Sequence, residues 1–215
     1  MKPKWLLTLA LSAISLAVCA VFLPPSHTSA NPAPATPFLA LSAVCVPEMP
    51  AKAAELVHAA DPIERAQTVQ DTLHAITMLA KPGLMPYVVS AICAKDPEMA
   101  ATAVLTATEL QGEDAGRFCL AALCAAPAQV EPIVTAACEA APADFANVAL
   151  AAAEQAPSQK ALILQAVTNA VPDVQRFLDA AEIQAGTDDL LPVMRQTVLL
   201  MRQAAKSDTN SLPLN

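Results

Sequence analysis

The stretch 127–156 reads PAQVEPIVTAACEAA and then PADFANVALAAAEQA, two fifteen-residue phrases with almost the same pattern. Proline recurs at this step of fifteen well beyond the two phrases, and Gly112 stands at the one position where proline is missing. Internal repetition at a fixed period says more about a fold than any single motif does. Seven units begin at residues 82, 97, 112, 127, 142, 157 and 172, and a fainter eighth begins at Thr187.

Each unit has the apolar pattern of one short helix. Its fourth, seventh, eighth and eleventh residues, such as Val130, Ile133, Val134 and Ala137, follow the i, i+3, i+4, i+7 spacing of a single helical face. Proline suits the start of a helix, because the first turn leaves its N–H groups unpaired in any case. The tenth residue is alanine in six of the seven units, which permits neighbouring helices to approach closely.

The sequence therefore predicts an all-α fold, an α-solenoid of short antiparallel helices with a period of about 15 residues. Helices of about 11–12 residues are marginal alone in water and need neighbours to persist. We expect the helical-repeat domain at 82–205, an N-terminal cap of two helices at 48–81 and a disordered tail at 206–215. Residues 31–47 indicate a linker, proline-rich at its start, in which residues 38–46 could be extended or helical against the cap.

Composition supports helices over strands. Hydrophobic residues make up 55% of the chain but aromatic residues only 3%, and there are only four glycines. Alanine loses no side-chain entropy in a helix, whereas strands favour β-branched and aromatic residues.

Residues 1–30 have the features of an export signal: Lys2 and Lys4, an apolar run over 5–23, and small residues before a predicted cleavage after Ala30. The run is nearly long enough to span a bilayer, so an uncleaved membrane anchor is an alternative. Lipidation at Cys19, in the lipobox-like sequence LAVC, is a third possibility. We expect the protein to be exported, either periplasmic or secreted, or else anchored by its N-terminal apolar segment.

Net charge limits the classes of partner. The formal net charge is −8, and beyond residue 30 the chain has 20 acidic and only 10 basic residues. Nucleic-acid binding needs clustered Lys and Arg, which this chain lacks, so nucleic acid is not an expected partner. The same charge disfavours an anionic membrane surface, so membrane contact is expected only through a retained N-terminal segment.

Five cysteines follow the predicted leader, and export would bring them into an oxidising compartment. Their number is odd, so at least one stays unpaired or bridges two chains; we expect a free buried thiol. None of their spacings forms a CxxC pair. The possible disulfide cysteines are Cys45, Cys93, Cys119, Cys124 and Cys138.

Two histidines follow the predicted leader, and each comes three residues after a carboxylate: His58 after Glu55 and His74 after Asp71. This spacing places each pair on one helical face. The pairs could form a metal or general-base site, but a zinc site needs three or four ligands and the sequence has no HExxH motif. We therefore interpret both histidines as polar residues on exposed faces and predict no metal site.

The sequence also lacks the motifs of a catalytic or cofactor site. There is no GxSxG elbow, and Ser90 and Thr135 lie inside expected helices, where we interpret them as packing residues. The glycines are too dispersed to form a phosphate-binding loop, and Gly186 is expected at a helix C-terminus. We therefore predict no catalytic residue and no cofactor, and expect that the protein is not an enzyme.

The phrase APAQVEPIVTAACEAAP (126–142), together with the start MPAKAAELV at Met49, resembles a group of uncharacterised, exported, alanine-rich repeat proteins of environmental bacteria. The resemblance covers about residues 47–180. It implies a helical-repeat fold and no particular activity.

These features favour an exported, non-enzymatic helical-repeat scaffold or protein-binding module of the bacterial envelope, because solenoids present long surfaces that bind proteins or peptides. The identity of such a partner is not encoded in any motif. Two alternatives remain open: a structural envelope protein that self-associates as a homo-oligomer, and a helical protein that binds a lipid or another small ligand.

Overall fold

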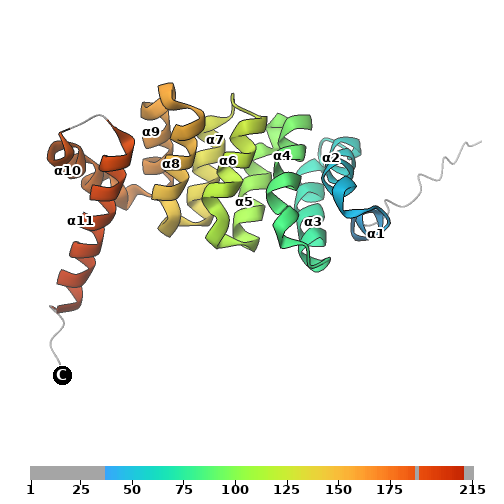
Figure 1. Cartoon of the computed structure of the whole chain (residues 1–215), viewed down its shortest axis with the longest axis horizontal. Helices are drawn as coiled ribbons and strands as arrows, with labels where there is room; N and C mark the ends of the chain where they lie inside the picture. Colours follow the sequence, from blue (N-terminus) through green and yellow to red (C-terminus); the bar gives the residue numbers. More distant parts are fainter. Residues whose placement is uncertain (1–36, 187–188, 211–215) are drawn as a thin grey trace, which may run out of the picture. The chain divides into compact units, whose positions relative to one another are not determined.

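The computed structural model describes residues 37–186 and 189–210, with side chains up to residue 204 (Figure 1). All regular elements in these ranges are helices, which confirms the predicted all-α helical-repeat fold. The chain divides into residues 1–34 and residues 35–215, and every described helix belongs to the second unit. The predicted export signal lies outside the described residues, as do residues 31–36 of the predicted linker.

Six of the seven units that begin at residues 82 to 172 contain a three-residue 3₁₀ turn, an eleven-residue α-helix and one connecting residue. In the fifth unit these are η5 (Pro142–Asp144), α8 (Phe145–Gln155) and Ala156. In the fourth, a turn at 127–128 precedes α7 (Val130–Ala140). The other pairs are η2 (Pro82–Leu84) with α4 (Met85–Lys95), η3 (Pro97–Met99) with α5 (Ala100–Leu110), η4 (Gly112–Asp114) with α6 (Ala115–Ala125), η6 (Pro157–Gln159) with α9 (Lys160–Ala170), and η7 (Pro172–Val174) with α10 (Gln175–Ala185).

The repeated proline acts mainly on the helix before it. A residue that precedes proline is pushed out of the α region, and Ala141, before Pro142, has φ −134° and ψ 73°. This residue ends α7, and the proline then begins the 3₁₀ turn rather than the α-helix, which is a correction to the expected helix start. The turn closes through a hydrogen bond of 3.0 Å from the Asp144 amide to the Ala141 carbonyl.

The helices are arranged in two layers. Each helix from α2 to α7 packs most extensively against its second neighbour, so that α2, α4, α6 and α8 form one layer and α3, α5, α7 and α9 the other (Figure 1). Consecutive helices reverse direction obliquely: the chain turns by 119° between α7 and the segment Pro142–Gln155. We call the layer of α2, α4, α6 and α8 the even layer and that of α3, α5, α7 and α9 the odd layer.

The core follows the predicted apolar face. The seventh residue of every unit is buried: Val88, Ala103, Phe118, Ile133, Val148, Ile163 and Leu178. The tenth residue is buried in the odd layer, at Thr106, Ala136 and Ala166, but only half-buried in the even layer, at Ala91, Ala121 and Ala151. The two layers therefore use the same alanine position differently.

The N-terminal part is more regular than expected. The predicted cap contains α2 (Met49–Ala59) and α3 (Arg65–Met78), and η1 (Val46–Glu48) precedes α2 just as the other 3₁₀ turns precede their helices. Part of the predicted linker is helical, because α1 (Pro37–Ser42) packs against α3 and α2. The apolar side chain of Leu41 is fully buried there, which explains why this segment is ordered.

The C-terminal helices depart from the repeat. As predicted, Gly186 ends α10, and it has a φ of +57° that glycine adopts readily. The last helix, α11 (Leu190–Asn210), has 21 residues and packs against α10 and α8, so the alternation of layers does not continue. It includes residues 206–210, which were predicted to be disordered; no glycine or proline follows Pro192 until Pro213, so nothing ends the helix at the fifteen-residue step.

Candidate binding grooves

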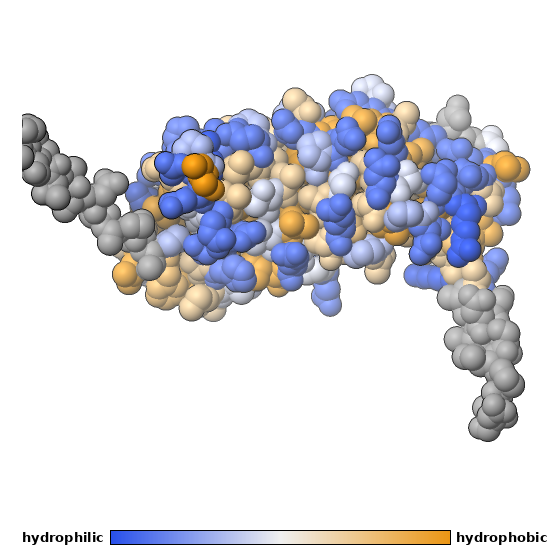
Figure 2. Space-filling view, turned by 180° about the vertical axis from the view of Figure 1, so that it is seen from behind, coloured by the Kyte–Doolittle hydropathy of each residue, from blue (hydrophilic) through white to orange (hydrophobic). Residues whose placement is uncertain are grey.

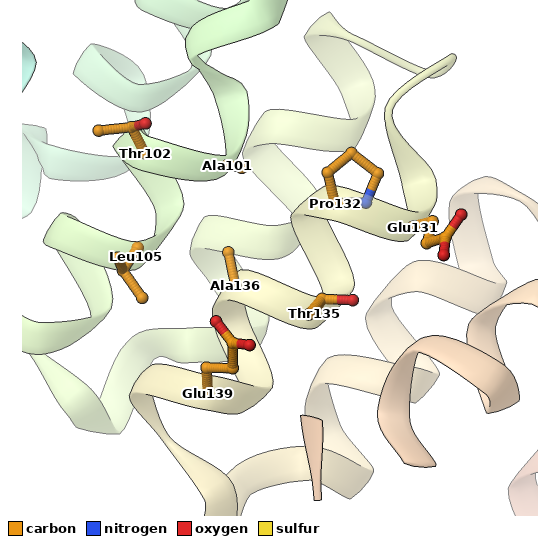
Figure 3. Close-up of a pocket in the computed structure, with 8 residues that line it drawn as sticks. All are labelled: Ala101, Thr102, Leu105, Glu131, Pro132, Thr135, Ala136 and Glu139. Atoms are coloured by element: carbon orange, nitrogen blue, oxygen red, sulfur yellow. The ribbon is translucent and has the colours of Figure 1, made fainter. Parts of the chain in front are cut away.

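A groove of about 530 Å³ runs between α5 and α7 on the outer side of the odd layer (Figure 3). The α5 wall is small and apolar or weakly polar, and the α7 wall carries two carboxylates. We call this the α5–α7 groove. It is lined by Ala101, Thr102, Leu105, Glu131, Pro132, Thr135, Ala136 and Glu139.

The two glutamates lie toward opposite ends of the exposed face of α7, with Pro132, Thr135 and Ala136 between them (Figure 3). They are eight residues apart, which corresponds to about 12 Å along a helix. Both side chains are exposed, and neither forms an ion pair with another described residue. The groove therefore offers an uncompensated carboxylate at each end of a small apolar floor.

Negative charge is concentrated in the four units that contain and adjoin this groove. Residues 97–156 contain eight acidic residues and one basic residue, Arg117. The Arg117 guanidinium is already used locally, because its Nη1 lies 3.2 Å from Asp114 Oδ1. The acidic residues are Glu98, Glu109, Glu113, Asp114, Glu131, Glu139, Asp144 and Glu154. A partner for this part of the array is favoured if it is basic.

A second groove, of about 440 Å³, lies between α2 and α4 in the even layer. No charged side chain lines it. Tyr87, on α4, is 65% exposed although it is large and aromatic. We call this the α2–α4 groove. Its lining residues are Val46, Pro47, Pro50, Leu84, Tyr87, Ser90, Ala91 and Ala94.

A third and smaller groove, of about 250 Å³, lies between α9 and α10. Many of its lining side chains carry an amide or a carboxylate. Two of these groups already pair with each other, since Gln175 Nε2 donates a hydrogen bond to Asp179 Oδ1 at 2.7 Å. Outside the grooves, the face in Figure 2 mixes hydrophilic and apolar side chains. The α5–α7 and α2–α4 grooves are therefore the stronger candidates for binding.

A buried carboxylate joins the cap to the first repeats. The Asp96 side chain is only 4% exposed, and its Oδ1 accepts a hydrogen bond of 2.9 Å from His58 Nδ1. Arg65 Nη1 lies 3.6 Å from the same oxygen and donates to Glu98 Oε1 at 3.0 Å. The imidazole of His58 is 56% exposed, as interpreted from the sequence, but its partner is Asp96 rather than Glu55, which pairs with Lys52 at 3.1 Å. This cluster links α2, α3 and the α4–η3 connection and lies outside the three grooves.

The other histidine has no role in such a cluster. His74 is exposed on α3, and Asp71, the carboxylate expected beside it, accepts a hydrogen bond of 2.9 Å from Gln67 Nε2. In the described ranges, no group of three or more His, Cys, Asp or Glu side chains is placed to hold a metal ion.

The five possible disulfide cysteines are all free in the structure. Cys93, Cys119 and Cys138 are buried, whereas Cys45 and Cys124 are exposed. Desolvation raises the pKa of Cys93 and of Cys138 to about 12, and it raises the pKa of Cys119 as well. The three buried thiols therefore stay protonated at neutral pH and are unsuited to nucleophilic or redox chemistry.

The positions of Ser90 and Thr135 beside the grooves were not predicted from the sequence. Ser90 and Thr135 were interpreted as packing residues, but both are half-buried and line the α2–α4 and α5–α7 grooves respectively. The sequence signal for these two grooves is divided between units, since each groove combines residues from second-neighbour helices.

No single described helix is long and apolar enough to cross a bilayer; α7 and the segment Pro142–Gln155 reach that length only together, as a bent pair. No protein-family model matches the chain, and neither a curated protein nor a solved structure matches it.

Proposed function

We propose that this protein is an exported, non-enzymatic helical-repeat scaffold of the bacterial envelope that binds a protein or peptide partner. The observation that carries the proposal is the α2–α4 groove, an uncharged apolar hollow on the surface of an acidic protein. Export rests on the features of residues 1–30 in the sequence.

Tyr87 is the side chain best placed to anchor a partner. It occupies the sixth position of its unit, and the equivalent residues of the next two even-layer helices are Arg117 and Asn147. Tyrosine combines a large apolar surface with a polar tip, and it is enriched among residues that dominate binding energy. Leu84 and Val46 add apolar surface beside it, so an apolar peptide segment fits the chemistry of this groove better than a charged one.

The chemistry of the side chains supports binding rather than catalysis. Catalysis by a histidine needs the imidazole within reach of a bound substrate. His58 instead donates to Asp96, away from the grooves, and the three buried thiols are held protonated. Ser90 in the α2–α4 groove lies among Pro, Val, Leu, Tyr and Ala residues, none of which can act as its general base at neutral pH.

The experiment is site-specific photocrosslinking in living cells. A photoreactive phenylalanine analogue replaces Tyr87 in one strain and Asn147 in a second; both residues are exposed, lie on even-layer helices and occupy the sixth position of their units. We expect one discrete crosslinked protein from position 87, identified by mass spectrometry, and none or a different set from position 147.

A competing prediction makes the test decisive. If position 87 gives no crosslinked protein while the folded chain is abundant, or if both positions give the same products, the α2–α4 groove is not the binding site. Fractionation of the same cells tests export, since the protein should be found outside the cytoplasm.

A further inference from the structure

We propose that the chain also self-associates, by seating the exposed face of α11 from one copy in the α5–α7 groove of a second copy. This inference does not rest on the proposed function, since it uses a different groove in the opposite layer. It assigns a partner to the two uncompensated glutamates of that groove.

The α11 helix presents a stripe of alternating apolar and basic residues. Leu191, Arg195, Leu199 and Arg202 are all exposed, and their spacing of four, four and three residues places them on one helical face. The opposite face is buried, with Val193, Met194 and Thr197 fully inaccessible. Leu199 and the arginines on either side of it therefore form an exposed surface on α11, the last described helix.

The stripe matches the groove in charge and in spacing. Arg195 and Arg202 are seven residues apart, about 10 Å along the helix, whereas Glu131 and Glu139 are about 12 Å apart. Leu199 lies between the two arginines, just as Thr135 and Ala136 lie between the two glutamates, and Leu105 on α5 adds apolar surface across the groove. A helix laid along α7 therefore brings each arginine to a carboxylate and the leucine to the floor.

The occupant must come from another copy. Within one chain α11 packs against α8, which belongs to the even layer, whereas the α5–α7 groove opens on the odd layer. If each of two copies seats its α11 in the groove of the other, the two form a closed dimer. If each copy binds the α11 of a different copy, an open chain of copies forms. Both arrangements make association depend on concentration.

The experiment is sedimentation velocity over a range of concentrations, using the full chain as its host cell produces it. Reductant is present throughout, because Cys45 and Cys124 are exposed and could crosslink copies. We expect the average mass to rise with concentration above that of one chain, and the association to weaken in about 0.5 M salt, where charges are strongly screened.

Paired charge reversals locate the contact. We expect the Glu131→Lys/Glu139→Lys variant and the Arg195→Glu/Arg202→Glu variant each to weaken association by about tenfold or more, since like charges face each other. Combining all four substitutions in one chain should restore association. The matched control is Glu109→Lys/Glu154→Lys, which makes the same change in net charge at exposed positions on α5 and α8 that do not line the groove.

Four results would each overturn the proposal. They are a chain that stays monomeric at every concentration, a control variant that weakens association as much as the groove variant, a groove variant that associates normally, and a quadruple variant without recovery. Far-ultraviolet circular dichroism confirms that each variant remains helical. If the Glu131→Lys/Glu139→Lys variant is not helical, the Glu131→Gln/Glu139→Gln variant replaces it, and this variant should also weaken association.

Discussion

Replacing Phe118 by alanine tests the packing on which the whole array depends. Phe118 is the largest fully buried side chain among the described residues, and it is the seventh residue of its unit. It lies on α6, which packs against α4 and α8 in its own layer and against α5 and α7 in the other. Removing a buried aromatic ring costs about 3–5 kcal/mol, which combines lost transfer free energy with the cavity that remains. With helices on both sides and across the layer, collapse around the cavity is limited, so we expect the upper half of that range.

The assay is urea unfolding followed by circular dichroism at the helical band, with the free energy of unfolding obtained by linear extrapolation. Tyr87→Ala is the matched control, because it also removes an aromatic ring from an even-layer helix but from a side chain that is 65% exposed. We expect it to cost about 1 kcal/mol at most. A loss below that value for Phe118→Ala, or equal losses for the two variants, would refute the packing described above.

Three further outcomes follow from the buried polar groups and thiols. Asp96→Ala should lower the free energy of unfolding by about 1–3 kcal/mol in urea titrations, because it leaves the largely buried Arg65 with only the exposed Glu98 as a partner. Glu98→Ala should lower it by well under half as much, because Arg65 then keeps the buried Asp96. Of the five cysteines that the structure describes, a thiol-reactive maleimide should label Cys45 and Cys124 in the folded protein, counted by intact mass, and should reach the three buried thiols only after denaturation. Burial raises the pKa of those three thiols above the ordinary 9.0, so the unfolded chain loses their protons first, and unfolding free energy measured by urea titration should fall as pH rises from 9.0 toward about 12.

The period of the array could be read from the sequence because it depends on local physics. Proline restricts the residue before it, and the apolar spacing within one unit defines one helical face, so helix ends and the buried seventh position follow from fifteen residues at a time. Gly186 was placed correctly for the same reason. The 3₁₀ turn was missed because proline fits the start of either kind of helix.

Features that depend on contacts between units were not predictable in the same way. The tenth position is alanine in both layers, yet its burial differs between Ala136 and Ala151 because the layers face different neighbours. Asp96 pairs with His58, which is 38 residues away, and no spacing rule joins them. The α2–α4 and α5–α7 grooves likewise arise between second-neighbour helices, so a single unit carries only part of each lining.

The alternation of layers limits how this chain can change length in evolution. Duplicating or deleting one unit would place every later helix in the opposite layer, and tenth-position side chains that are buried in the odd layer would become half-buried. A change of two units, thirty residues, keeps every later helix in its own layer and next to a neighbour of the expected kind. Related chains of other lengths should therefore differ by whole helix pairs, with the glutamate-lined face of α7 preserved or lost together with α8 or α6.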